Sequence, residues 1–172
     1  PLGSANKVIA VDAASNRITA TYDGVDNPHG LVATPDGEYL VAGSLSETPL
    51  PAGAAMDTAN SKLAVIHPAH GHVMSTIPVA GWTHHQAITP DGRYVLSTHP
   101  TRGGISVADL IENKVVHTVA TGPAPNYAVV TPDGKRVYVS NSGNGTISEI
   151  DTADWKVTRT LDAGASPEHM LL

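Results

Sequence analysis

A tetrapeptide that occurs three times constrains the fold of this chain more than any other feature. Residues 34–37, 89–92 and 131–134 all read Thr-Pro-Asp-Gly, and each copy lies between two short apolar runs. Proline presets φ at the second position of a tight turn, Asp accepts backbone hydrogen bonds, and Gly supplies the positive φ that closes the turn. Each copy therefore predicts a hairpin turn between two β-strands.

The spacing of these turns predicts the fold class. Asp91 and Asp133 are 42 positions apart, and Asp36 precedes Asp91 by 55, with the excess in the Pro/Ala/Gly-rich stretch 47–60. A period of about 40–50 residues that holds four short strands is typical of β-propeller blades. We therefore predict an all-β fold, a β-propeller of four-stranded antiparallel blades with about four blade equivalents.

The repeats also predict where the blades begin and end. Residues 1–4, Pro-Leu-Gly-Ser, look like the scar of a cleaved expression tag. The rest is predicted to hold a half blade (5–24), three whole blades (25–81 with the insertion 47–60, 82–122 and 123–164) and the first strand of a further blade (165–172). Because open sheet edges favour association, we expect either the remaining blades of a longer propeller or a homodimer, or imperfect closure as a four-blade monomer.

Composition excludes several classes of function. The chain of 172 residues is 41% apolar, so it can build a sizeable core, and it has no Cys. The lack of Cys excludes disulfides, thiolate zinc sites and covalent c-type haem. A net charge of −6 without a basic run argues against nucleic-acid binding. No apolar stretch is long enough to predict a membrane span.

The third repeat carries a family resemblance. Its second strand reads Tyr138-Val139-Ser140-Asn141, with Thr-Pro-Asp-Gly before it, and it resembles the YVTN repeat, a β-propeller blade common in secreted bacterial and archaeal proteins. The second repeat departs from the pattern, because His99 takes the place of the Asn. The resemblance implies the propeller fold and a periplasmic or extracellular location. It leaves enzymatic activity open, because such propellers include lactonase-like enzymes, haem-d1 proteins, metal-handling proteins and interaction surfaces.

Histidines occupy equivalent positions at the start of successive blades. These positions, together with the end of the second strand, are predicted to meet at one rim of the central channel, opposite the Thr-Pro-Asp-Gly turns. Neutral imidazole is a common ligand of Cu, Zn and Fe, and each blade can supply one. We therefore predict a transition-metal site, with Cu or Zn as the metal. Its predicted ligands are His29, His84, His85, His99, His169 and Glu168.

Other interpretations remain open at this point. The rim histidines could simply hydrogen-bond in a wet channel mouth. The arrangement is also similar, in position only, to copper and haem-d1 propeller oxidoreductases, so one alternative is an oxidoreductase domain whose copper cluster or haem d1 is completed by missing blades. Another alternative is a protein-interaction scaffold. A second cluster, His67, His70 and His72, is predicted in an exposed turn on the opposite face.

Overall fold

The computed structural model describes all 172 residues and contains fourteen β-strands and one short 3-10 helix, η1 (Gly3–Ala5). The strands are β1 (Lys7–Asp12), β2 (Arg17–Asp23), β3 (Pro28–Ala33), β4 (Leu40–Ser44), β5 (Ser61–His67), β6 (His72–Val79), β7 (Gln86–Ile88), β8 (Tyr94–His99), β9 (Gly104–Asp109), β10 (Lys114–Ala120), β11 (Pro125–Val130), β12 (Arg136–Asn141), β13 (Thr146–Asp151) and β14 (Lys156–Asp162).

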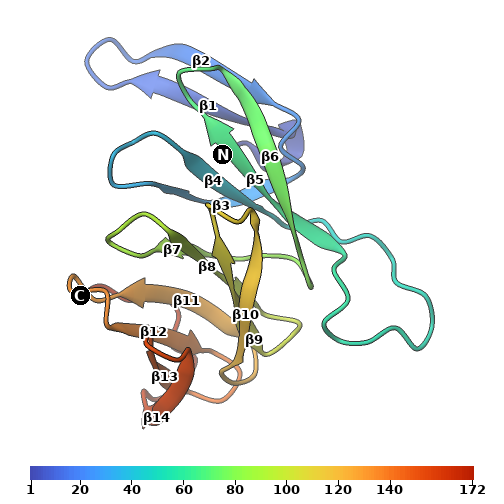
Figure 1. Cartoon of the computed structure of the whole chain (residues 1–172), viewed down its shortest axis with the longest axis vertical. Coiled ribbons are helices and arrows are strands. Elements are labelled where there is room, and N and C mark those ends of the chain that lie inside the picture. The colour runs from blue at the N-terminus through green and yellow to red at the C-terminus, as the bar shows by residue number, and fades with distance from the viewer.

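Consecutive strands pair to form the sheets of a propeller. Three sheets have four strands each, in the orders β3-β4-β5-β6, β7-β8-β9-β10 and β11-β12-β13-β14, and every pairing is antiparallel. A fourth sheet contains only β1 and β2. The sheets follow one another from β1-β2 at the top of Figure 1 to β11-β14 at the bottom. The predicted all-β fold with propeller blades is confirmed, and the three whole sheets lie within the predicted blades.

The Thr-Pro-Asp-Gly turns form as their residues predict. Gly134 has a φ of 71°, and its N–H donates to the Thr131 carbonyl at 2.8 Å. The Thr131 hydroxyl donates to Asp133 at 2.6 Å and accepts from the Arg136 N–H at 3.0 Å. The other two copies repeat these contacts. Each turn thus fixes the register of the first two strands of its blade.

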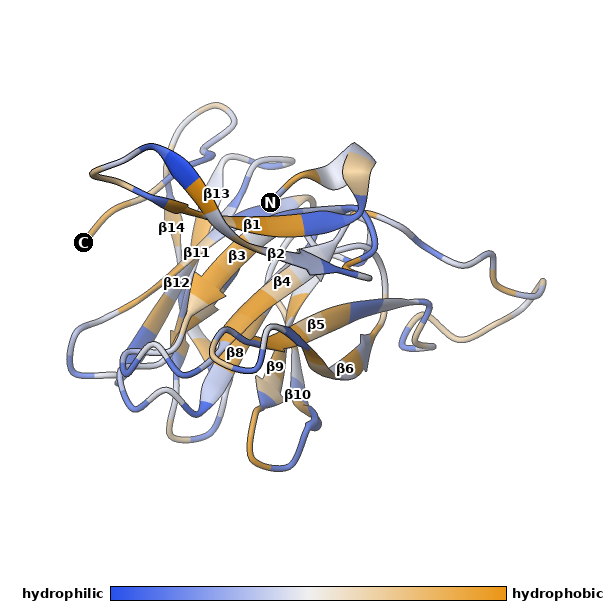
Figure 2. Cartoon of the chain, turned by 90° about the horizontal axis from the view of Figure 1, so that it is seen from above, coloured by the Kyte–Doolittle hydropathy of each residue, from blue (hydrophilic) through white to orange (hydrophobic).

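The core lies between consecutive sheets. One apolar cluster joins the β1-β2 pair to the first whole blade, a second joins the first and second blades, and a third joins the second and third. Val, Ile, Leu and Ala dominate all three, and Leu63, Leu96 and Ile150 are fully buried. Figure 2 shows hydrophobic residues along β1, β4 and β5, and hydrophilic residues mainly in the connecting turns. The blades are therefore held together by sheet-on-sheet burial.

The ring of blades is open in this structure. The β1-β2 pair hydrogen-bonds to no strand from the C-terminal part of the chain, so the two ends do not form a fourth blade. The structure has no helix with the length and apolar character that membrane spanning requires.

The predicted strand at 165–172 does not form. Its start nevertheless occupies the place of a first strand, because the Ser140 hydroxyl donates to the Glu168 carbonyl at 2.6 Å, as the Thr98 hydroxyl donates to the Asn126 carbonyl at 2.9 Å one blade earlier. A β-ladder needs a neighbouring strand, and no second strand pairs with this segment.

The long insertion forms a loop between β4 and β5 that extends to the right of Figure 1. Its base is fixed by hydrogen bonds from the Thr48 N–H to the Asn60 carbonyl at 2.7 Å and from the Ser61 hydroxyl to the Ser46 carbonyl at 2.7 Å. Asn60 also ties the loop to β6, because its N–H donates to the Val79 carbonyl at 3.0 Å.

Candidate functional site

Two histidines from adjacent blades meet at the predicted rim. His29 lies in β3, and His84 lies just before β7, the first strand of the next blade. Their ring centroids are 4.9 Å apart, with the rings tilted by 39°. The His29 side chain is exposed. Desolvation and the neighbouring His84 lower the pKa of His29, so its imidazole is neutral at pH 7.

A backbone contact orients the ring of His84. Its Nδ1 lies 3.1 Å from the Asn126 carbonyl, so Nδ1 carries the proton and donates it. In the neutral ring of His84 this tautomer leaves the Nε2 lone pair free. Donation of one ring N–H to a carbonyl is also the usual way in which proteins orient a metal-binding histidine.

His85 lies beside this pair but has the opposite tautomer. The Ala128 N–H donates to its Nδ1 at 3.4 Å, so the proton of the neutral ring is on Nε2. Burial, with His84, His169 and His29 nearby, lowers the pKa of His85 to about 4. His85 therefore offers the rim an N–H donor.

Aromatic stacking links His85 to the C-terminal segment. The ring of His85 stacks on Tyr127 with centroids 3.5 Å apart, and Tyr127 lies 4.9 Å from the ring of His169. His169 and Glu168 are both exposed. The structure thus brings His29, His84, His85 and His169 to one rim, as the repeat positions predicted.

His99 does not join this cluster. It is buried, at 3% exposure, and its Nδ1 lies 3.2 Å from the carbonyls of Gly81 and Trp82. Its Nε2 lies 2.6 Å from the Ser106 hydroxyl. Burial lowers the pKa of His99 to about 4. With Nδ1 as donor and Nε2 as acceptor, both nitrogens of the ring are used inside the blade.

The described arrangement is not a preformed metal cage. No group of three or more His, Asp or Glu side chains stands in position to hold a metal ion.

The second histidine cluster lies at the turn between β5 and β6, as predicted. His67 and His70 stack there with centroids 3.9 Å apart, and the His72 Nδ1 lies 3.0 Å from the His70 carbonyl.

Aromatic side chains lie next to the rim histidines. Trp82 lies with its ring 6.1 Å from His84, edge to face, and Tyr127 stacks on His85. Tyr127 follows Asn126, the counterpart of His84 in the next repeat, and therefore occupies the repeat position of His85. The repeat alignment thus places Tyr127 in the same rim column as His85 and His169.

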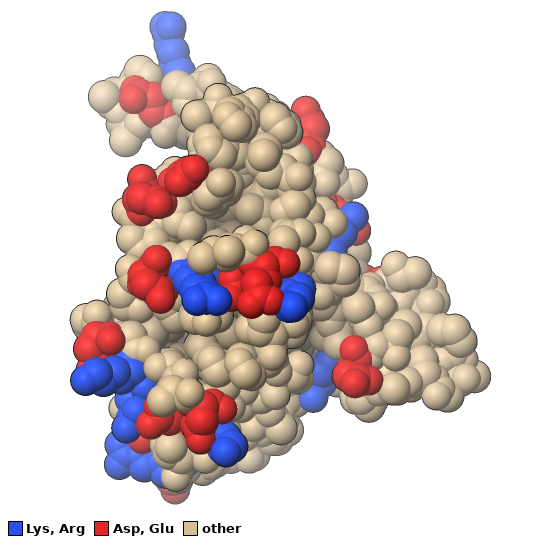
Figure 3. Space-filling model, viewed as in Figure 1, with Lys and Arg blue, Asp and Glu red and all other residues tan.

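The charged surface seen in Figure 3 is mixed, with Lys and Arg next to Asp and Glu. Several of these residues form ion pairs, such as Arg93 with Asp109 at 2.7 Å and Arg136 with Asp151 at 2.8 Å. The face in this view has no broad basic area of the kind that nucleic-acid binding would use.

Two solved structures with the same fold are much longer chains. Hydrazine synthase from Kuenenia stuttgartiensis superposes with a TM-score of 0.79 at 22% identity, over 92% of this chain and 44% of that one. A functionally unknown protein from Desulfotomaculum acetoxidans DSM 771 gives 0.79 at 16% identity, over 95% and 51%. This chain thus spans about half the length of either structure. At these identities the likeness shows the fold alone.

No curated protein sequence matches the chain. The family model for the YNCE-like β-propeller, however, matches residues 2–172. This match confirms the expectation of a β-propeller repeat family. The chain belongs to the YNCE-like β-propeller family.

Proposed function

We propose that this propeller module binds one transition-metal ion, Cu or Zn, at the channel rim, with His29 and His84 as its protein ligands. The observation that carries the proposal is the pair itself: two imidazoles from different blades, 4.9 Å apart, one of them oriented by a carbonyl through its other nitrogen. Imidazole nitrogen suits both metals. Two ligands leave the remaining coordination positions to water or to an exogenous ligand.

The protonation states at the rim support this assignment. The lowered pKa of His29 keeps its lone pair available at pH 7, and His84 already carries its proton on the nitrogen that faces Asn126. His85 is assigned a different role, because its Nε2–H can donate to a ligand bound on the metal. His169 and Glu168, exposed at the same rim, are the candidate third ligands. His99 is left out of the ligand set because both of its nitrogens already have partners.

We also propose a cellular location for the module and a way in which its ring of blades is completed. The resemblance to secreted propellers favours a periplasmic or extracellular location. The open ring favours completion by further blades or by a second copy of the chain, which could add ligands to the rim.

Calorimetric titration of Zn²⁺ and Cu²⁺ tests the proposal, with protein purified without a nickel column. We expect one ion per chain for the unmodified protein and loss of this binding in His29→Ala/His84→Ala. The matched control is His70→Ala/His72→Ala, which removes two histidines from the opposite face and should abolish only weak additional binding. Full affinity in the rim variant together with its loss in the control would contradict the proposal.

Absorbance spectra and the metal titrations together distinguish the alternative functions. An oxidoreductase domain with haem d1 or a copper cluster would show visible absorbance bands when isolated from its native source. An interaction scaffold would bind neither metal stoichiometrically and would be indifferent to both double substitutions.

A further inference from the structure

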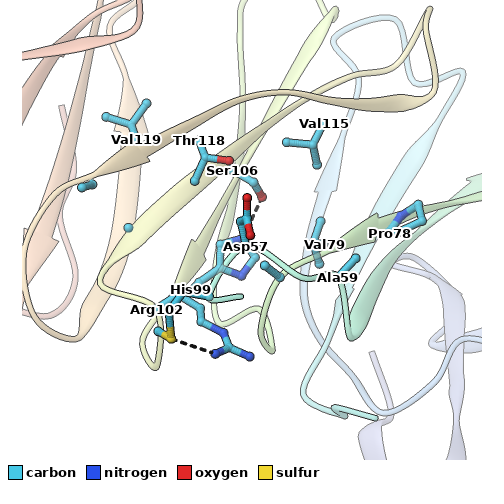
Figure 4. Close-up of a pocket in the computed structure, with 14 residues that line it drawn as sticks. Asp57, Ala59, Pro78, Val79, His99, Arg102, Ser106, Val115, Thr118 and Val119 are labelled. Carbon is cyan, nitrogen blue, oxygen red and sulfur yellow. Dashed lines mark hydrogen bonds between the residues drawn. The ribbon is translucent and has the colours of Figure 1, made fainter. Parts of the chain in front are cut away.

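A cavity lies between the first and second whole blades, away from the rim pair. It is lined by the end of β6, by β10 and by the insertion loop, it is partly open to solvent, and its volume is about 220 Å³ (Figure 4). Val79, Val115 and Val119 form its apolar wall, and Val79 and Val119 are buried. The insertion thus covers a hollow that could hold a small branched aliphatic group.

Comparison with the next pair of blades explains why the hollow exists. Between the second and third blades, the Ser148 hydroxyl donates to the Thr121 carbonyl at 3.0 Å and so bridges the two sheets. Ser106 and Val79 are the residues 42 positions earlier. Between the first and second blades this bridge is absent. The Val79 carbonyl accepts a hydrogen bond from the Asn60 N–H of the insertion at 3.0 Å, and the Ser106 hydroxyl contacts His99.

The cavity is lined by one cation and one anion. Arg102 forms no ion pair; its guanidinium makes only long contacts, 3.4 Å to the Asn60 side-chain oxygen and 3.7 Å to the Met56 sulfur, and its buried Nε has no partner. A side-chain carboxylate is the usual partner of such a group. Asp57, on the loop, lines the same cavity and also forms no ion pair.

Arg102 and Asp57 are the only charged residues that line the cavity. The remaining polar lining includes His99, Ser106 and Thr118, and burial keeps the His99 ring neutral at pH 7. An amine alone would leave the buried Nε of Arg102 without a partner. Asp57 is exposed and stays hydrated when a carboxylate binds alone, so an ammonium group on the same ligand adds a second charged contact. A molecule that carries both charges next to an aliphatic chain would match the whole lining.

We propose that this inter-blade cavity binds a free aliphatic α-amino acid, with its carboxylate on Arg102, its ammonium on Asp57 and its side chain against Val79, Val115 and Val119. The insertion loop serves as the cover of the site. This site is independent of the metal-binding rim.

Calorimetry with three probes tests this assignment on the unmodified protein. The probes are L-leucine, 4-methylpentanoate, which lacks the amino group, and 3-methylbutylamine, which lacks the carboxylate. We expect leucine to bind most tightly. Arg102→Gln should weaken leucine binding by at least about tenfold, the typical worth of a charged hydrogen bond, and leave 3-methylbutylamine unchanged. Asp57→Asn should weaken leucine binding and leave 4-methylpentanoate unchanged.

Controls separate loss of the site from loss of the fold. Arg17→Gln and Asp154→Asn remove exposed charges of each sign elsewhere and should not change leucine binding. Ala80→Leu should fill the cavity and abolish binding of all three probes, while β-sheet circular dichroism shows that the variant is folded. The proposal is overturned if none of the probes binds at millimolar concentration, if 4-methylpentanoate binds as tightly as leucine, or if Ala80→Leu leaves leucine binding intact.

Discussion

The Nε2 atom of His99 lies 2.6 Å from the Oγ atom of Ser106. The same cross-strand position in the next blade is occupied by Asn141, whose Nδ2 donates to Ser148 at 3.0 Å. His99 therefore has, in the second blade, the structural role that Asn141 has at the end of the second strand of the third blade. Its imidazole ring is larger than the Asn amide. Its additional bonds to the carbonyls of Gly81 and Trp82 fix the connection that leads to the rim.

Substitutions at His99 test this structural role. His99→Asn restores the residue found in the third blade and should cost less than about 1.5 kcal/mol of unfolding free energy, because an amide can still bond Ser106. His99→Ala should cost about 2–4 kcal/mol, because it leaves a cavity and removes the partner of two carbonyls. Urea denaturation measures both. Equal costs for the two variants would show that the hydrogen bonds of His99 contribute nothing.

The stability of the fold should depend on pH through the buried histidines. The folded-state pKa of His99 is about 4, below the ordinary 6.5, because burial disfavours the charged ring. Unfolding then takes up a proton, so stability is complete above pH 6.5 and falls as the pH drops toward 4. His99 should contribute on the order of 3 kcal/mol to this loss. His85, with a pKa also about 4 but a more exposed ring, should add less.

Urea denaturation between pH 7.5 and 4 measures this dependence, and His99→Asn serves as the matched variant. The variant should lose clearly less stability than the unmodified chain over this range. Parallel profiles for the two proteins would mean that His99 titrates normally in the folded state.

A buried carboxylate, Glu149, should stabilise the third blade. Glu149 is 7% exposed and accepts hydrogen bonds from Tyr138 at 2.9 Å and from Arg159 at 2.7 Å. Arg159, followed by Tyr138, lowers the pKa of Glu149 to about 2. Glu149→Ala should lower the melting temperature more than Arg159→Ala, because it removes the shared partner of Tyr138, Thr158 and Arg159. Arg159→Ala removes a largely solvated side chain and leaves Glu149 its bonds from Tyr138 and Thr158. The reverse order would contradict this account.

The sequence predicted the fold well because its strongest signals are local. The Thr-Pro-Asp-Gly turns specify their own geometry, so Gly134 adopts positive φ wherever the rest of the chain lies. The repeat period then places His29 and His84 in adjacent blades, which is why their meeting could be predicted. Local chemistry and a fixed period together determine these features.

The features that the sequence did not predict depend on neighbours distant in the chain. The His99 side chain at the end of β8 lies inside the blade, next to Ser106. Only the equivalence of His99 with Asn141, which contacts Ser148 in the third blade, could have predicted this position. Trp155 adopts a φ of 55° in a turn where other repeats have Asn or Gly, and it packs against Tyr94 and His117. The cavity under the insertion likewise requires the position of the loop in space.

The open ends of the blade array should favour association. Val11 and Ile18 in the β1-β2 pair are 51% and 61% exposed, whereas the inner sheets bury their apolar faces against one another. Sedimentation velocity at increasing concentration should therefore show self-association, and Val11→Lys/Ile18→Lys should reduce it. A chain that stays monomeric at all concentrations would contradict this expectation.

The most direct test of the metal-binding rim is electron paramagnetic resonance of the protein loaded with one equivalent of Cu²⁺ at pH 7. We expect superhyperfine splitting from at least two imidazole nitrogens. His29→Ala and His84→Ala should each show one nitrogen fewer, and His70→Ala/His72→Ala should leave the spectrum unchanged. A spectrum that survives both rim substitutions but is lost in the His70/His72 variant would place the copper on the opposite face and contradict its assignment to His29 and His84.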